Sequence, residues 1–349
     1  MTQAQAAATM TNGADATLPF LDVRNLVKEF PVTRGAVLQR RVGSVHAVSG
    51  VSFQVMPGET FGLVGESGCG KTTTGRMIVA LERPTSGAIL IDGDNIVAMS
   101  PRQTRRRRRD AQMMFQDPYA SLDPRMRVLT ILREPMAIQR MGTRREQHAR
   151  ALELLNDVGL SRNALERYPH EFSGGQRQRI GLARALAVNP RLVVADEPVS
   201  ALDVSIRSQI LNLMNRLQQK YGLTYVIISH DLSVVKYMSD RIGVMYLGKL
   251  VEIGSGEELY SNPAHPYTQA LVRAIPIPDP EVERHKAYRT PLGELPSAVH
   301  PPSGCRFRTR CPRAQPVCAE SEPLLRSFGP KHMAACHFPL RPPREETVA

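Results

Sequence analysis

The sequence predicts an α/β fold of the phosphate-loop type, in which a mainly parallel sheet carries a nucleotide at the carboxyl ends of its strands. First, the glycine-rich segment 65–73 follows the apolar run 61–64 and opens a predicted helix over residues 71–81. Second, two more apolar runs, 191–198 and 225–231, end in charged or polar side chains. Ligands of open α/β sheets bind at such strand ends.

Composition limits the class of protein. The chain has 349 residues, enough for two or three domains, and a net charge of +12. That charge suits nucleic acid or an anionic membrane surface without choosing between them. No stretch approaches the ~18–20 apolar residues of a membrane span. Residues 1–19 lack the features of a signal peptide and are expected to form a flexible tail. We therefore expect a cytosolic chain, whose five cysteines do not form structural disulfides.

The segment 65–73 matches the phosphate-loop pattern G-x₄-G-K-[ST] in full. Glycines let the backbone turn sharply and bring its N–H groups against phosphate oxygens. A lysine then supplies charge, a threonine hydroxyl reaches Mg²⁺, and the helix N-terminus faces the anion. A chance match is the alternative, but the flanking strand and helix disfavour it. The predicted nucleotide contacts are Gly65, Ser67, Gly68, Cys69, Gly70, Lys71, Thr72 and Thr73, with Cys69 a spacer and Thr72 also a Mg²⁺ ligand.

Two carboxylates, Asp196 and Glu197, end the run 191–198. Neighbouring strand residues point to opposite sides, so we expect one to serve the Mg²⁺ shell and the other an attacking water. His230 ends the run 225–231. A histidine at a strand end is more often structural, but a phosphate loop in the same chain favours a catalytic role.

The segment FSGGQRQRI (172–180) predicts a second helix N-terminus able to bind phosphate. An N-cap would explain Ser173, but not Gly174 and Gly175 followed by Gln176. One nucleotide needs one such cradle. Two cradles in one chain therefore suggest that each completes a site on a partner subunit.

Residues 65–231 carry six motifs in an order that resembles ABC-type ATPases: GESGCGKTT, FQDPYASLDP, SGGQRQR, VVADEP, SALD and SHD. The resemblance implies a P-loop (RecA-like) ABC ATPase core with an antiparallel β subdomain and a helical subdomain. It places this core at 20–258, with the helical subdomain at about 100–180. An amphipathic helix is also predicted there, from Ala151, Leu154, Leu155 and Val158.

The same resemblance implies roles for single residues. Asp196 and Gln116 would bind Mg²⁺, Glu197 would be the catalytic carboxylate, and His230 would contact the γ-phosphate, with Gln116 also near the water. The resemblance further implies ATP contacts from the opposite subunit and an aromatic on the adenine: Ser173, Gly174, Gly175, Gln176 and Asp203 in trans, and Phe30 in cis. A buried core role is the alternative for Phe30.

Five consecutive arginines, Arg105–Arg109, form the densest charge run. Such a run is usually a solvated surface. No stacking aromatics accompany it, which disfavours single-stranded nucleic acid. Anionic lipid headgroups are a further alternative.

The last ninety residues, 259–349, form a Pro/Cys-rich extension. The segment 262–276, with His265-Pro266-Tyr267, and GELPS (293–297) resemble oligopeptide, dipeptide and some nickel permease ATPases. Four cysteines, Cys305, Cys311, Cys318 and Cys336, lack the C-x₂-C pairs of common zinc folds. The resemblance implies a [4Fe–4S] cluster as a structural staple, with Zn²⁺ or unligated thiols as alternatives and His337 as a spare ligand.

These inferences predict an ATP-hydrolysing subunit of an ABC importer for di- and oligopeptides, with ATP and Mg²⁺ as its ligands. Its expected partners are a second ABC ATPase subunit (itself or a homologue), two membrane permease subunits and an extracytoplasmic peptide-binding protein. It would lie peripherally on the cytoplasmic face of the membrane and bind no nucleic acid. The alternatives are an importer ATPase for nickel or another small solute, and a soluble ABC ATPase acting on nucleic acid or ribosomes.

Overall fold

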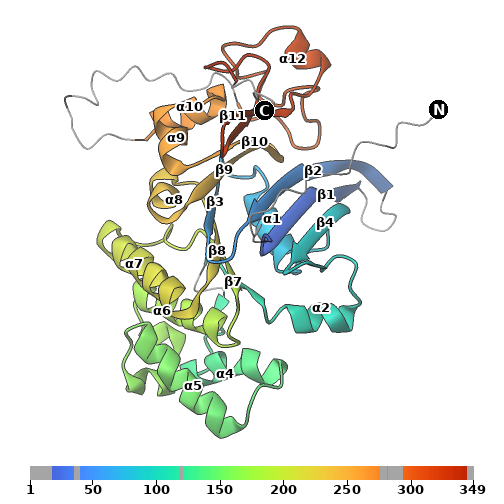
Figure 1. The fold of residues 1–349 in the computed structure, drawn as a ribbon. Coiled ribbons are helices and arrows are strands. Elements are labelled where there is room, and N and C mark those ends of the chain that lie inside the picture. Colours follow the sequence, from blue (N-terminus) through green and yellow to red (C-terminus); the bar gives the residue numbers. More distant parts are fainter. Residues whose placement is uncertain (1–17, 35–39, 118–120, 276–280, 282–293, 344–349) are drawn as a thin grey trace.

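The computed structural model describes residues 18–34, 40–117, 121–275, 281 and 294–343. Its centre is an eight-stranded mixed sheet in the order β11-β12-β10-β9-β3-β8-β7-β6 (Figure 1). Five neighbouring strands are parallel, and the three at one edge pair antiparallel. The parallel strands are β3 (Thr60–Val64), β6 (Ala111–Met114), β7 (Leu192–Asp196), β8 (Thr224–Ser229) and β9 (Arg241–Tyr246); the others are β10 (Lys249–Gly254), β11 (Leu325–Gly329) and β12 (His332–Ala335). The predicted α/β class is confirmed.

A second, four-stranded antiparallel sheet covers one side of the first, as expected for the β subdomain (Figure 1). Its order is β2-β1-β4-β5, with β1 (Leu21–Arg34), β2 (Arg40–Val55), β4 (Ser86–Ile91) and β5 (Asp94–Asn95). Alternate residues of β7 divide between two cores. Val194 packs in the core shared with this sheet, whereas Val193 packs in the core shared with the helices. Continuous apolar runs are typical of parallel strands buried on both faces.

Helices cover the other face of the main sheet, and three of them, α4 to α6, lie between β6 and β7 in the sequence. They are α4 (Val128–Ile138), α5 (Arg144–Asp157), α6 (Gly174–Leu186), α7 (Val204–Tyr221) and α8 (Leu232–Met238), with 3₁₀ turns at Arg162–Glu166 and Pro169–Glu171. A capping box between Thr143 and Glu146 starts α5. The predicted apolar face of this helix is confirmed, since Ala151, Leu154, Leu155 and Val158 are all buried. Within the described ranges, no helix combines the length and apolarity needed to cross a bilayer.

The helix after the phosphate loop, α1 (Lys71–Ile78), is shorter than the predicted 71–81. Ala80 takes a left-handed φ of 56°, and the Leu81 and Glu82 amides both donate back to the Arg76 carbonyl. The chain thus leaves the helix two residues after Ile78. The prediction was wrong because it took Pro84 as the stop signal.

The arginine run ends the surface helix α2 (Pro101–Arg107). Its side chains are less free than a solvated run would be, because four of the five bond to the protein. The contacts are Arg105 to the Ile138 carbonyl, Arg107 to Asp94 and Asp110, Arg108 to the Ala80 carbonyl, and Arg109 to the Val188 carbonyl.

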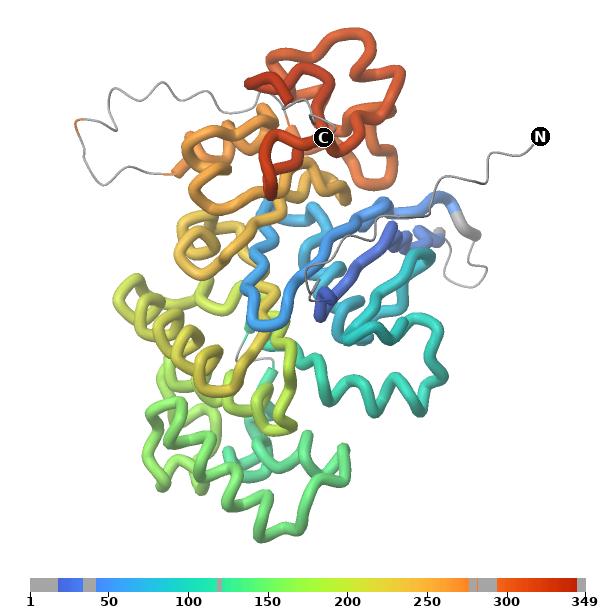
Figure 2. Tube along the Cα trace, viewed as in Figure 1, coloured from blue at the N-terminus to red at the C-terminus, as the bar shows by residue number. Residues whose placement is uncertain are grey.

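The C-terminal extension continues the main sheet. It holds α9 (Gly256–Ser261), α10 (Pro266–Arg273) and α12 (Val317–Glu320), and its hairpin β11–β12 pairs with β10. Figure 2 shows the extension at the opposite end of the molecule from the helices α4 and α5. The strands β11 and β12 were not predicted from the sequence, because runs of five and four residues are too short to show a clear alternation.

A buried carboxylate fastens the extension to the sheet. Glu252 on β10 is fully buried and accepts from the amides of Ala264 (2.6 Å) and His265 (2.9 Å). His332 Nε2 on β12 lies 2.6 Å from Glu252 Oε1, the oxygen that also accepts from the Ala264 amide. A buried charge needs such partners, and through them Glu252 joins residues 264–265 and β12 of the extension to β10.

Candidate functional site: a phosphate loop and a catalytic carboxylate

The phosphate loop connects β3 to α1, and two of its glycines are sterically required. Gly70 has φ 106°, and a Cβ there would lie 2.2 Å from the Ala47 carbonyl oxygen. Gly65 has φ 153°, and a Cβ there would lie 2.1 Å from the Met245 carbonyl oxygen. Real Cβ atoms do not approach backbone this closely. The loop therefore keeps its path only with glycine at both positions.

Lys71 is the buried cation of this loop. Its side chain, 5% exposed, donates from Nζ to the carbonyls of Gly65 (2.7 Å) and Glu66 (2.9 Å). The N-cap of α1, Gly70, offers no side-chain cap to the first amides of the helix. The ammonium and these amides together form the kind of anion site that phosphates occupy.

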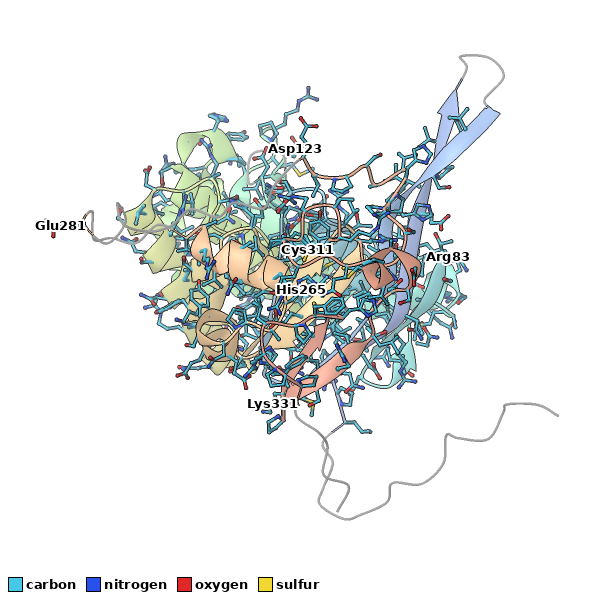
Figure 3. The ribbon with its side chains drawn as sticks, turned by 90° about the horizontal axis from the view of Figure 1, so that it is seen from above. Arg83, Asp123, His265, Glu281, Cys311 and Lys331 are labelled. Carbon is cyan, nitrogen blue, oxygen red and sulfur yellow. The ribbon has the colours of Figure 1, made fainter. Side chains whose placement is uncertain are left out.

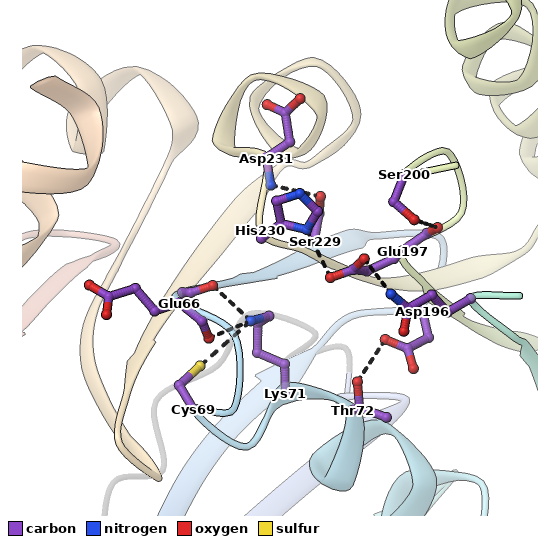
Figure 4. Close-up of polar contacts among 12 residues, drawn as sticks. Glu66, Cys69, Lys71, Thr72, Asp196, Glu197, Ser200, Ser229, His230 and Asp231 are labelled. Carbon is purple, nitrogen blue, oxygen red and sulfur yellow. Dashed lines mark hydrogen bonds and ion pairs between the residues drawn. The ribbon is translucent and has the colours of Figure 1, made fainter. Parts of the chain in front are cut away.

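Thr72 and Asp196 meet at the end of β7. The Thr72 hydroxyl donates to Asp196 Oδ1 at 3.0 Å (Figure 4). Burial raises the pKa of Asp196; the Thr72 hydrogen bond opposes this, and the neighbouring Glu197 carboxylate adds to it. Hydroxyl and carboxylate oxygens are the donors that Mg²⁺ accepts, so this pair fits the predicted metal shell.

The Glu197 carboxylate contacts both of the other predicted catalytic residues. Gln116 Nε2 donates to its Oε2 at 2.7 Å. His230 Nδ1 lies 2.9 Å from its Oε1 (Figure 4). The carboxylate side chain is 12% exposed, whereas the histidine is 54% exposed. Residues distant in sequence thus converge on one carboxylate beside the phosphate loop.

Asp196 and Glu197 have different partners, as predicted, but the predicted reason was wrong. Strand alternation does not separate them, because β7 ends at Asp196. Glu197 lies beyond the strand with a left-handed φ of 47°, and its amide donates to the Ile228 carbonyl at 2.8 Å. Such a conformation is rare for glutamate and is typical of functional sites.

The second predicted cradle is the N-terminus of α6. Ser173 and Gln176 cap this helix reciprocally, and a Cβ on Gly175 would lie 2.6 Å from Ile206 Cγ2. Gly174 lies beside it, and Asp203, exposed at the start of α7, makes no side-chain cap. No hydrogen bond or ion pair joins these residues to the phosphate loop across the ranges the structure describes. The structure does not bring the two cradles together within one chain.

The remaining predicted nucleotide contacts differ in exposure. Ser67 and Gly68 are exposed and Thr73 is half-buried on α1. Cys69 is 1% exposed, and burial raises the pKa of its thiol. Phe30 is half-buried on β1, with the Lys28 ammonium 4.8 Å from its ring centroid, so it does not belong to either buried core.

Four cysteines of the extension lie within electrostatic reach of one another. Burial raises the pKa of Cys336 to about 12, and Cys305, Cys311 and Cys318 add to this shift. The Cys305 amide donates to the Cys318 carbonyl at 2.8 Å. All four are free thiols. Nevertheless, no group of three or more His, Cys, Asp or Glu residues in the described part of the chain is arranged to hold a metal ion, so the predicted metal site is without structural support.

One feature of the loop was missed from the sequence. The Glu66 amide donates to the Tyr267 hydroxyl at 3.0 Å, and its carboxylate accepts from Arg310. Both partners belong to the extension, which Figure 3 views from above with His265 and Cys311 labelled. No local pattern pairs residues 201 and 244 positions apart.

Two protein families match separate parts of the chain. The ABC transporter family matches residues 48–200, and the family described as "Oligopeptide/dipeptide transporter, C-terminal region" matches residues 251–318. The oligopeptide transport ATP-binding protein AppF of Bacillus subtilis is 52% identical over 319 residues, covering 91% of this chain and 97% of AppF. Oligopeptide transport ATP-binding protein OppF of Escherichia coli is 51% identical over 295 residues, covering 84% and 88%.

Solved structures give a similar result for the core. The dimeric structure of MJ0796, a bacterial ABC transporter cassette, superposes with a TM-score of 0.60 at 28% identity, covering 67% of this chain and 98% of that one. CbiO1 from Clostridium perfringens, part of the ABC transporter complex cbiONQ, gives a TM-score of 0.60 at 25% identity, covering 70% and 91%. The likeness therefore covers about two thirds of this chain and nearly the whole of each solved cassette.

Proposed function

The chain belongs to the ABC transporter ATP-binding subunits of the oligopeptide/dipeptide permease family, and we propose that it hydrolyses ATP at Glu197 to power peptide uptake through membrane permease subunits. One observation carries the catalytic assignment. A single carboxylate, beside a phosphate loop, is held by both Gln116 and His230. That arrangement suits a base which orients a water against a γ-phosphate.

The mechanism follows from the residues present. Lys71 and the first amides of α1 would hold the β- and γ-phosphates, and the glycines of the loop allow that approach. Thr72, Asp196 and Gln116 would hold Mg²⁺, which when bound neutralises charge on the phosphate oxygens. Glu197 Oε1 or Oε2 would accept the proton of the attacking water. His230 would contact the γ-phosphate from the exposed side of the site.

We also propose that two subunits complete each site. The cradle Ser173–Gln176 and Asp203 would contact ATP held by the opposite subunit, and Phe30 would stack on the adenine within its own subunit. The dimeric cassette that resembles the core supports a paired arrangement. The corresponding division of the chain is a tail at 1–19, a nucleotide-binding domain at 20–258 with a helical subdomain at about 100–180, and an extension at 259–349.

The remaining partners follow from the family. Two permease subunits and an extracytoplasmic peptide-binding protein would complete the importer, with this chain on the cytoplasmic face of the membrane. A cavity of about 240 Å³ is lined by Phe115, Leu122, Ile138 and Arg184, among others. We assign this cavity, next to the described part of the loop 115–126, to the permease helix that receives the motion of closure.

The four extension cysteines remain a proposed [4Fe–4S] site. Thiolates favour both Zn²⁺ and iron–sulfur clusters. In the structure, Cys305, Cys311 and Cys318 all add to the raised pKa of Cys336, whereas no group of three or more metal-ligating side chains in the described residues is arranged to hold a metal ion. Iron and sulfide analysis of anaerobically purified protein tests it; one equivalent of zinc, or no metal, would contradict it.

Transport decides between the candidate cargoes. The chain, its permease subunits and the binding protein are reconstituted in liposomes, and uptake of labelled di- and oligopeptides is compared with uptake of Ni²⁺. We expect ATP-dependent peptide uptake, and ATP hydrolysis that rises when peptide-loaded binding protein is added. Uptake of Ni²⁺ without uptake of peptides would show that nickel is the transported solute. Co-purification with nucleic acid or ribosomes in place of permeases would overturn the transport role.

A further inference from the structure

Glu66, the second residue of the phosphate loop, is held by the extension at two points. Its carboxylate oxygens lie 3.0 and 2.9 Å from Nη1 of Arg310, and its amide donates to the Tyr267 hydroxyl at 3.0 Å. Its carbonyl meanwhile accepts from Lys71 Nζ at 2.9 Å. One loop residue therefore connects the extension to the buried lysine of the nucleotide site.

The ion pair is shielded from solvent. The side chain of Arg310 is 9% exposed and that of Glu66 is 28% exposed. Arg310 Nε is buried without a hydrogen-bond partner among the described residues, and the Tyr246 hydroxyl lies 3.5 Å from Nη1. Keeping a guanidinium this buried and partly unsatisfied is unfavourable in itself. The contact with Glu66 is what offsets that penalty.

The groups that hold Glu66 are themselves rigidly packed. Tyr267 packs edge-on against Tyr246 at 4.7 Å between ring centroids, and Phe307 lies 5.2 and 5.3 Å from these two rings. Arg306 donates to the Ser49 hydroxyl at 2.9 Å. These contacts join the loop 305–311 of the extension to both core sheets, so Arg310 has little freedom to follow Glu66 if the loop moves.

The Glu66 side chain points away from Lys71, as Figure 4 shows, so the ion pair lies on the outer side of the loop. We propose that Arg310 and Tyr267 are positioning residues of the ATPase. By fixing Glu66, they set the path of the Gly65 and Glu66 carbonyls and thereby the place of Lys71. Neither residue would touch the nucleotide. This inference rests on the proposed use of the loop for ATP, and it gives the extension a part in ATP binding.

The test is steady-state ATP hydrolysis by the full chain assembled with its permease subunits. A misplaced loop weakens contacts that ground and transition states share, which raises KM and leaves kcat unchanged. Arg310→Ala should raise the KM for ATP about tenfold, as expected for the loss of a charge-assisted hydrogen bond, with kcat within about twofold. Arg310→Lys should restore most of the affinity, because a single nitrogen makes both contacts in the structure.

A double-mutant cycle separates positioning from general stability. If Arg310 acts through the Glu66 carboxylate, Glu66→Gln/Arg310→Ala should be no worse than either single change. Arg308 belongs to the same loop but donates to Ser303 within the extension, so Arg308→Ala is the matched control and should leave KM unchanged. Tyr267→Phe retains the ring and should raise KM about threefold by leaving the Glu66 amide unpaired.

Active wild-type protein together with an Arg310→Ala variant of unchanged KM would overturn the inference alone. Additive effects in the cycle would do the same. Wild-type protein that does not hydrolyse ATP would instead contradict the proposed function. If Arg310→Ala fails to fold, the Kd for ATP is measured directly for Glu66→Gln and Arg310→Lys. A normal Kd for Glu66→Gln overturns the inference. A raised Kd for Glu66→Gln together with a normal Kd for Arg310→Lys supports it.

Discussion

The nucleotide site and the extension meet at Glu66, but different kinds of contact position their residues. Side chains proposed for Mg²⁺ binding and catalysis lie at strand ends: Asp196 ends β7, and His230 follows the last residue of β8. The extension contacts Glu66 of the loop through partners 201 and 244 positions away. The proposed chemical step therefore depends on short motifs that the sheet positions. The conformation of the phosphate loop depends also on contacts with residues far away in the sequence.

This difference predicts two kinds of defect. Changes at strand ends should remove the chemical step while ATP still binds. Changes in the extension should weaken binding or stability while the chemical step is preserved. The predictions for Glu197 and His265 each test one side of that separation, and the prediction for Phe30 concerns a residue outside both regions.

The largest effect is expected for Glu197→Gln. The amide cannot accept the proton of the attacking water, so kcat should fall by about 10²- to 10⁴-fold, the usual contribution of a general base. ATP binding should persist, because Lys71 and the amides of α1 are untouched. Phosphate release measured beside the Kd for ATP separates the two quantities.

Glu153→Gln is the matched control for that variant. Glu153 pairs with Arg150 on the surface of α5 and should not alter hydrolysis. A Glu197→Gln protein that hydrolyses ATP at the wild-type rate would show that another group is the base, and would remove the proposed division between the two regions.

A smaller effect, on stability, is expected from His265 in the extension. Burial lowers its pKa to about 4, although the nearby Glu252 carboxylate opposes the shift. The folded state then binds fewer protons than the unfolded state. Stability should be constant above the unfolded pKa of about 6.5 and fall as pH drops from there to about 4, by roughly 3 kcal/mol in total.

His265→Asn tests this pH dependence. Asparagine retains an acceptor for the Tyr267 amide, which His265 Nδ1 binds at 3.0 Å, and it does not titrate. Denaturant unfolding of both proteins across this pH range should give a flatter profile for the variant. Equal slopes would show that His265 does not remain neutral in the fold, and that solvent reaches its ring.

The sequence predicted residues that meet beside the phosphate loop, but it did not predict the contacts by which the extension holds that loop. Motifs such as GESGCGKTT and SHD identify residues that the fold brings together, because parallel strands end at a common edge. The packing of Arg310 on Glu66 leaves no such trace, since any of the 45 lysines and arginines is an equal candidate for one carboxylate. The φ of 47° at Glu197 was equally hidden, because propensity does not anticipate a strained glutamate.

The smallest expected effect concerns Phe30, which belongs to neither region. Its half-buried ring on β1 carries the Lys28 ammonium at 4.8 Å and is free of the two cores, as an adenine-stacking residue should be. Stacking contributes about 0.5–1.5 kcal/mol, so Phe30→Ala should raise the KM for ATP about two- to tenfold, with kcat and thermal stability unchanged. Phe30→Tyr should behave as wild type. A stability loss of about 3 kcal/mol in Phe30→Ala, with normal KM, would instead identify a packing residue, and the adenine would then need another aromatic or apolar partner.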